Sequence, residues 1–116
     1  MAKINLAITG CLGRMGRQLI KTAVKDRSVK IVSLTENTFL NKKISGIYLE
    51  KNSEKAFRNA HVIIDFTSPK CTFEVLKIAS KLKKKVVIGT TGFSKTEENH
   101  IKKFSKKISI LKAGNM

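Results

Sequence analysis

Three glycines spaced three residues apart, Gly10, Gly13 and Gly16, form the segment of this sequence with the clearest chemical potential. They stand between an apolar run and a run with helical spacing, which is the usual context of a turn that holds a phosphate group. The common dinucleotide fingerprint G-x-G-x-x-G does not fit, because Leu12 and Met15 replace its second and third glycines when Gly10 is the first. The spacing alone leaves two interpretations open, a phosphate-binding turn of altered spacing and a glycine-rich structural bend.

Each glycine of this turn has its own predicted role. Gly10 permits a tight exit from a strand, Gly13 lets the backbone approach a pyrophosphate, and Gly16 allows helix and sheet to pack closely. Arg14 adds a positive charge at the phosphates. Glu36 follows at the end of the second predicted strand, where an acidic side chain accepts hydrogen bonds from the adenosine ribose. With the helix and Glu36 in these positions, dinucleotide binding becomes the favoured interpretation.

The elements that must position these residues alternate between strand and helix along nearly the whole chain. Apolar and β-branched runs predict strands over 4–8, 29–34, 61–66 and 108–113, a strand and turn over 86–93, and a possible short strand over 47–49. Helical spacing and capping residues predict helices over 14–26, 53–57, 69–82 and 94–104. This order predicts an α/β fold, a doubly wound, Rossmann-like parallel sheet with helices on both faces, in one domain over 1–116.

In such a sheet ligands bind beyond the carboxyl ends of the strands. Polar and glycine-rich segments follow the predicted strands at 10–16, 35–37, 65–69, 89–92 and 113–116. Asp65 could lie at this edge or could cap the following helix, and Thr90 and Thr91 could equally be turn residues. His61 and His100 fit structural or exposed positions, and no paired carboxylates, activated nucleophile or metal cluster is evident. The sequence therefore predicts a cofactor site that holds no metal and contains no evident catalytic group.

The net charge of +16 raises a competing hypothesis, a non-catalytic basic module that binds nucleic acid or another polyanion. However, the basic residues are 20 lysines and only 4 arginines, and base readout and bidentate phosphate contacts favour arginine. The lysines gather at predicted helix ends, in 81–85 and 102–107, where cations complement the helix dipole. We therefore expect a solvated, lysine-rich surface without a nucleic-acid partner. Its field would also attract anionic small molecules such as dinucleotides and dicarboxylates.

The apolar runs and the cysteines of the sequence indicate where in the cell we expect the protein. No apolar run approaches the roughly 18 residues of a membrane span, and the N-terminal run has no cleavage site of a signal peptide. Cys11 and Cys71 have neither metal-ligand spacing nor the density of a disulfide scaffold. We expect a cytoplasmic protein with no membrane partner.

Together these segments resemble the family of dihydrodipicolinate reductases, also called 4-hydroxy-tetrahydrodipicolinate reductases, of the diaminopimelate and lysine pathway. The resemblance extends over the entire 116 residues and rests on GCLGRMGRQLI at 10–20, Glu36, DFTSP at 65–69, VVIGTTGF at 86–93 and AGNM at 113–116. In that family a G-x-x-G-R-M-G turn wraps the cofactor. The resemblance implies cofactor contacts for Gly10, Cys11, Leu12, Gly13, Arg14, Met15, Glu36, Phe66, Thr67, Ser68, Gly89, Thr90, Thr91, Ala113, Gly114, Asn115 and Met116.

The same resemblance implies hydride transfer from NADH or NADPH to a cyclic unsaturated dicarboxylate substrate, with Thr91 near a substrate carboxylate. The family's acid and its substrate-binding cations belong to a His-His-x-x-Lys segment of a second, α+β domain that also builds a homotetramer. This sequence contains no such segment and stops at Met116, where the family passes into that domain. We therefore expect this chain alone to bind the dinucleotide as a monomer, without turnover and with part of its core missing. A decayed gene product that folds poorly is a third hypothesis.

The choice between the two cofactors depends on Asn37. Many members of the family carry arginine there, which pairs with the 2′-phosphate of NADPH. Asparagine is neutral, and the neighbouring Glu36 would repel that phosphate, so the sequence predicts a preference for NADH. Lys42 and Lys43 could swing toward a 2′-phosphate, which keeps NADPH as the alternative.

Overall fold

The computed structural model describes residues 3–36 and 41–113, and the strands of these residues form one seven-stranded sheet. In chain order they are β1 (Ile4–Thr9), β2 (Val29–Thr35), β3 (Lys43–Ile44), β4 (Ile47–Glu50), β5 (Val62–Asp65), β6 (Lys85–Ile88) and β7 (Ile110–Lys112). They lie in the order β3-β4-β2-β1-β5-β6-β7, and every pair except β3 with β4 is parallel. The predicted α/β fold with a doubly wound sheet is confirmed.

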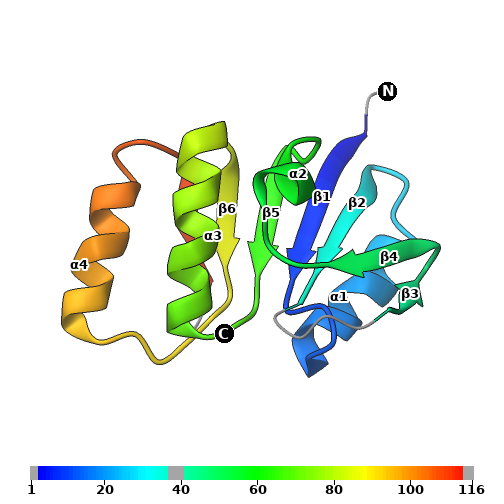
Figure 1. Cartoon of the computed structure of the whole chain (residues 1–116), viewed down its shortest axis with the longest axis horizontal. Helices are drawn as coiled ribbons and strands as arrows, with labels where there is room; N and C mark the ends of the chain where they lie inside the picture. The colour runs from blue at the N-terminus through cyan, green and yellow to red at the C-terminus, as the bar shows by residue number, and fades with distance from the viewer. Residues whose placement is uncertain (1–2, 37–40, 114–116) are drawn as a thin grey trace.

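Helices cover both faces of this sheet (Figure 1). One face packs against α1 (Arg14–Ala23), and the other against α2 (Glu54–Phe57), α3 (Pro69–Leu82) and α4 (Lys95–Phe104). Because side chains alternate along a strand, neighbouring residues of β1 belong to different cores, Ile8 on the α1 side and Ala7 on the α3 side. The burial of both faces near β1 explains why this strand is almost continuously apolar.

The cover is uneven on the α1 side of the sheet. No described helix packs there against β5, β6 or β7, and Leu111 of β7 is 63% exposed. Ile64 and Val87, which pair with each other on the same face, are half-buried. No described helix combines the length and the apolar character needed to cross a membrane.

Several bounds differ from the prediction, for example that of β7, which spans Ile110–Lys112 instead of 108–113. The largest differences concern β3 and α1. Ser45 and Gly46 both have positive φ, 50° and 82°, and they connect β3 to β4 as a two-residue hairpin at the edge of the sheet. The apolar pattern missed β3 because a strand of 2 residues is too short to show alternation. Helix α1 ends at Ala23, earlier than the predicted Asp26, because the chain turns there toward β2.

Serine residues cap three of the four described helices, as the sequence predicted. Ser53 accepts a hydrogen bond from the N–H of Ala56, Ser68 from that of Cys71, and Ser94 forms a capping box with Glu97. Helix α1 differs, because its N-cap residue is Gly13 and no side chain bonds its first turn. This end of α1 therefore keeps unsatisfied N–H groups that a ligand could bind.

Candidate functional site

The loops that follow β1, β5 and β6 surround one cleft at the carboxyl edge of the sheet, toward which the arrowheads of these strands point in Figure 1. The cleft consists of two adjoining hollows of about 380 and 250 Å³, which share Gly13, Phe66 and Thr67. The larger is also lined by Gly10, Leu12, Glu36 and Ser68, and the smaller by Arg14, Met15, Gly16, Gly89, Thr90 and Thr91. All of these residues except Gly16 are among the predicted cofactor contacts, so the fold brings most of that set together.

Two further predicted contacts, Cys11 and Ala113, do not line the cleft. Cys11 is 0% exposed and belongs to the hydrophobic cluster beneath α1, so its side chain is shielded from the cleft. Ala113 follows β7, where its N–H donates to the carbonyl of Ile88 at 2.8 Å. Gly114, Asn115 and Met116 lie outside the described residues, as does Asn37, on which the cofactor preference depends.

Two of the three glycines in the turn are required by the fold itself. Gly10 has a φ of +71°, and a Cβ atom there would lie 2.1 Å from the carbonyl oxygen of Phe66. A Cβ at Gly16 would lie 2.3 Å from the carbonyl oxygen of Gly10. Gly16 therefore packs closely against the backbone of the turn. This contact requires a glycine, and the predicted contact between helix and sheet does not.

Gly13 is different, because nothing in the described part of the protein requires glycine there. Its φ of −73° and ψ of 168° are open to any residue, and a Cβ would meet only the carbonyl oxygen of Gly10 at 3.4 Å, an ordinary contact. The space beside Gly13 belongs to the cleft. A glycine at this position leaves room for a group outside the protein to approach the backbone.

The first turn of α1 gives this part of the cleft a positive character. The N–H groups at a helix start have no acceptor within the helix, and here no side chain caps them. The first turn contains no acidic residue and begins with the exposed Arg14, a cation at the positive end of the helix dipole. This arrangement is unfavourable in the protein alone and becomes favourable when an anion binds.

Glu36 borders the larger hollow and is fixed to the turn. Its carboxylate Oε2 accepts a hydrogen bond from the N–H of Leu12 at 3.0 Å, and its own N–H donates to the carbonyl of Glu50 at 3.0 Å. The Nε of Arg17 donates to the carbonyl of Leu12 at 2.9 Å and holds the turn from the other side. The carboxylate therefore stands beside the glycine turn, where it can accept hydrogen bonds from the hydroxyls of a sugar.

A buried carboxylate lies directly beneath the cleft, and the sequence did not predict its role. Asp65 is 0% exposed, and its two oxygens accept hydrogen bonds from the hydroxyls of Thr9, Thr67, Thr72 and Thr90. The interpretation of Asp65 as a helix cap is wrong, since Ser68 caps α3. Strand alternation contained the missing signal, because Thr9 and Asp65 occupy positions of β1 and β5 that face the α3 core.

Both histidines occupy structural positions, in agreement with the sequence. The Nδ1 of His61 accepts the N–H of Asn5 at 2.8 Å, and the ring of His100 meets that of Phe73 edge-on at 6.0 Å. Within residues 3–36 and 41–113, no group of three or more His, Cys, Asp and Glu side chains is placed to hold a metal ion.

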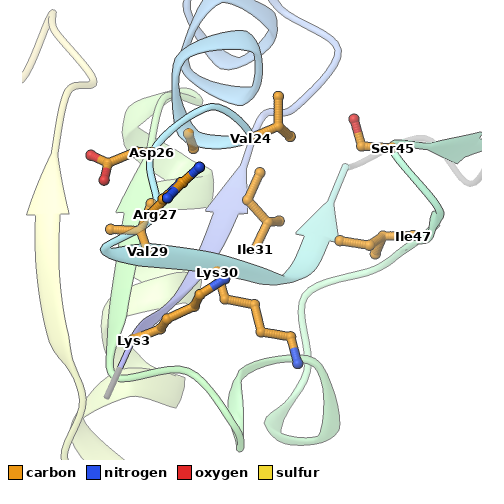
Figure 2. A pocket seen from close by; sticks show the side chains of 10 residues that line it. Lys3, Val24, Asp26, Arg27, Val29, Lys30, Ile31, Ser45 and Ile47 are labelled. Carbon is orange, nitrogen blue, oxygen red and sulfur yellow. The ribbon is translucent and has the colours of Figure 1, made fainter. Parts of the chain in front are cut away.

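A separate hollow of about 250 Å³ lies away from the cleft, at the amino end of β2. Figure 2 shows its side chains, which come from Lys3 before β1, the end of α1 and the turn after it, the start of β2 and the β3–β4 hairpin. Val24, Ile31 and Ile47 form its apolar part, and the cations of Lys3, Arg27 and Lys30 are exposed. None of the predicted site residues lies there, so the chemistry of the glycine turn belongs to the carboxyl edge alone.

The pKa of the Cys11 thiol makes the burial of this residue in the turn measurable. Burial, and after it the neighbouring Glu36 carboxylate, raises the pKa of Cys11 from 9.0 to about 11. Unfolding returns the thiol to water, where it ionises above pH 9 while the folded protein keeps it protonated. We expect the free energy of unfolding to fall by about 2 kcal/mol between pH 9 and pH 11 through this group.

Denaturant unfolding of the chain and of Cys11→Ala over this pH range isolates the effect, because the lysines titrate in both proteins. The two stabilities should converge as the pH rises. Parallel curves would contradict the raised pKa of the buried thiol.

Comparisons with known proteins agree with this geometry. The family model "Dihydrodipicolinate reductase, N-terminus" matches residues 4–116. Over its whole length the chain is 64% identical to a 4-hydroxy-tetrahydrodipicolinate reductase of Pelagibacter ubique, and it covers 45% of that protein. A second relative of the same name, from Buchnera aphidicola, is 38% identical over 97% of this chain and 46% of its own length. The chain thus spans about half the length of the curated relatives it matches.

Solved structures share the fold. A dipicolinate-bound dihydrodipicolinate reductase from Paenisporosarcina superposes with a TM-score of 0.81 at 22% identity, over 98% of this chain and 48% of that one. A homoserine dehydrogenase from S. aureus gives a TM-score of 0.79 at 18% identity, over 99% of this chain and 33% of that one. At these identities the superpositions establish the architecture only.

Proposed function

Because this chain belongs to the dihydrodipicolinate reductase family as its N-terminal, dinucleotide-binding domain, we propose that it binds NADH or NADPH for a 4-hydroxy-tetrahydrodipicolinate reductase. The observation that carries this proposal is the space at Gly13, beside an uncapped helix start and beside the fixed carboxylate of Glu36. A turn that served only the fold would need Gly10 and Gly16 but not Gly13. The residues present therefore fit a dinucleotide.

Each part of the cofactor has a matching group in the cleft. The N–H groups at the start of α1, together with Arg14, would hold the pyrophosphate, and Glu36 would accept hydrogen bonds from the adenosine ribose. The segments 66–68 and 89–91 would line the remaining length of the cofactor. When bound, the nicotinamide would supply the hydride for a cyclic unsaturated dicarboxylate, and the exposed Thr91 would lie near a carboxylate of that substrate.

We further propose that the 116-residue chain binds the dinucleotide as a monomer without turning over substrate. Its sequence holds no His-His-x-x-Lys segment, and it matches 45% of the Pelagibacter enzyme. Isothermal titration with NADH and NADPH tests the binding, and a reductase assay of the same preparation tests the turnover. Saturable binding without turnover is the expected result. Absence of binding would refute the proposed function, and full turnover would refute only the claim that the chemistry needs a further domain.

The same titrations test cofactor preference. Glu36 is fixed by the N–H of Leu12, and Lys43 lies over the ring of Tyr48 at 5.1 Å, where it contributes to a cation–π contact. We therefore expect NADH to bind about tenfold more tightly than NADPH, a difference of about 1.4 kcal/mol, because the carboxylate repels a 2′-phosphate.

A Glu36→Gln variant provides the control for this preference, because the amide keeps the shape of the side chain but lacks its charge. The variant should lose affinity for NADH and bind the two cofactors about equally. Tighter binding of NADPH to the unsubstituted chain, by about tenfold, would overturn the predicted preference.

A further inference from the structure

We propose that Asp65 and Thr90 are positioning residues of the dinucleotide site, and that Asp65 acts through the Thr90 hydroxyl to fix the backbone of Thr67 in the cleft. This inference rests on the proposed function and adds to it the buried Asp65 and a positioning role for Thr90, which lines the smaller hollow. Thr67 lines both hollows, whereas Asp65 lines neither, and the Thr90 hydroxyl donates to Asp65 at 3.0 Å. Asp65 is 0% exposed and Thr90 only 3%.

Four threonine hydroxyls surround the carboxylate of Asp65. One carboxylate oxygen accepts from Thr9 and from Thr67, the latter at 2.8 Å, and the other accepts from Thr72 and from Thr90, the latter at 3.0 Å. Neither of the ion pairs found among the described residues includes Asp65. Hydroxyl groups alone therefore satisfy this buried carboxylate, and each contributes one donated hydrogen bond.

The direction of these bonds links two loops. The Thr90 hydroxyl donates its single hydrogen to Asp65 at 3.0 Å, which leaves the lone pairs of its oxygen as acceptors. That oxygen accepts the backbone N–H of Thr67 at 2.8 Å. Asp65 thus orients the hydroxyl that receives this N–H, and the loop after β6 is joined to the loop after β5.

The network around Asp65 joins separate segments of the fold. Its four threonines come from the end of β1, the loop after β5, the first turn of α3 and the loop after β6. Thr9 immediately precedes Gly10, and a Cβ at Gly10 would lie 3.1 Å from the Cγ2 of Thr67. One carboxylate therefore fixes the three loops that surround the cleft. Apolar residues of similar volume would stabilise a core at least as well, so such a network is better explained by the loop geometry that it sets.

The test compares three single substitutions in the full chain. Thr90→Val removes the hydroxyl that receives the Thr67 N–H, and Thr90→Ser restores it. Thr72→Val is the matched control, because it removes an equally buried hydroxyl from the same carboxylate but on α3, away from the cleft. We expect Thr90→Val to weaken NADH binding by about tenfold and Thr90→Ser and Thr72→Val to stay within about twofold of the unsubstituted chain.

Amide hydrogen exchange at Thr67 in the free protein is the second measurement. Exchange should accelerate in Thr90→Val and should remain slow in Thr72→Val, even if the two variants lose similar stability. If Thr90→Val does not fold, Thr90→Ala makes the same deletion with a smaller side chain and is measured in its place.

Binding and exchange that are unchanged in the folded Thr90 variant would overturn the inference, as would an equal loss of affinity in Thr72→Val, which would indicate a general effect of stability. Failure of the unsubstituted chain to bind NADH or NADPH would refute the proposed function, and with it this inference. The two failures are distinguishable, because only the second involves the unsubstituted protein.

Discussion

Replacement of Gly13 by valine is expected to weaken NADH binding by about 100-fold, close to 3 kcal/mol, while the protein remains folded. A Cβ at this position has only one neighbour, the carbonyl oxygen of Gly10 at 3.4 Å, and the backbone angles suit any residue. The added side chain therefore fills space in the cleft and leaves the core unchanged. A pyrophosphate bound by the first turn of α1 would lose its close approach to the backbone.

Calorimetric titration measures the affinity, and denaturant unfolding of the same preparation measures stability. Stability should fall by no more than about 1 kcal/mol, because valine is a poorer N-cap residue than glycine. Gly13→Ala should give an intermediate affinity, since the obstruction increases with side-chain volume. Unchanged affinity in Gly13→Val would refute the role of this turn in phosphate binding. A polyanion-binding module predicts that outcome, with an affinity that instead decreases steeply with salt.

The Gly10→Ala substitution is expected to have the opposite signature, a loss of more than about 3 kcal/mol in the free energy of unfolding. Two costs combine at this position. Alanine would be forced to a φ of +71°, and its Cβ would lie 2.1 Å from the carbonyl oxygen of Phe66, which belongs to the backbone and cannot rotate away. Since a domain of this size is stable by only about 5–15 kcal/mol, the loss should be evident in urea unfolding.

Gly46→Ala separates the two costs of Gly10→Ala. Gly46 also has a positive φ, +82°, but nothing lies within 4 Å of the position that a Cβ would occupy there, so only the conformational cost remains. We expect a loss of about 1 kcal/mol in this variant. Equal losses in Gly10→Ala and Gly46→Ala would show that the contact with Phe66 relaxes, and that the turn is less rigid than its geometry implies.

Much of the fold could be predicted because its determinants are local. The helix caps Ser53, Ser68 and Ser94 bond to groups three residues away, and the apolar runs of the central strands need no knowledge of their neighbours. The edge strand β3 escaped prediction, because its pairing with β4 depends on a short turn through Ser45 and Gly46. The family resemblance was found for the same reason, since its motifs are short segments in a fixed order.

The sequence by itself also determined which loops meet. Parallel strands bring their carboxyl ends to one edge, so the turn that contains Gly13, the segment around Phe66 and the segment from Gly89 to Thr91 could be assigned to one site. It also gave each glycine of the turn its own predicted role. Only the structure shows why the fold requires glycine at Gly10 and Gly16 but not at Gly13, because the atoms that surround each Cβ position belong to the folded chain.

Only the tertiary structure decided the role of Asp65. Its partners Thr9 and Thr90 are distant in sequence, and they converge because β5 lies between β1 and β6, with Thr9 opposite Asp65 and Asp65 opposite Ile88. A sequence pattern records spacing along one element, whereas a buried carboxylate is satisfied by whichever donors the sheet order brings to it. The glycine turn could therefore be identified from its own residues and the segments that follow it. The hydrogen-bond network that holds the surrounding loops could not be identified from the sequence.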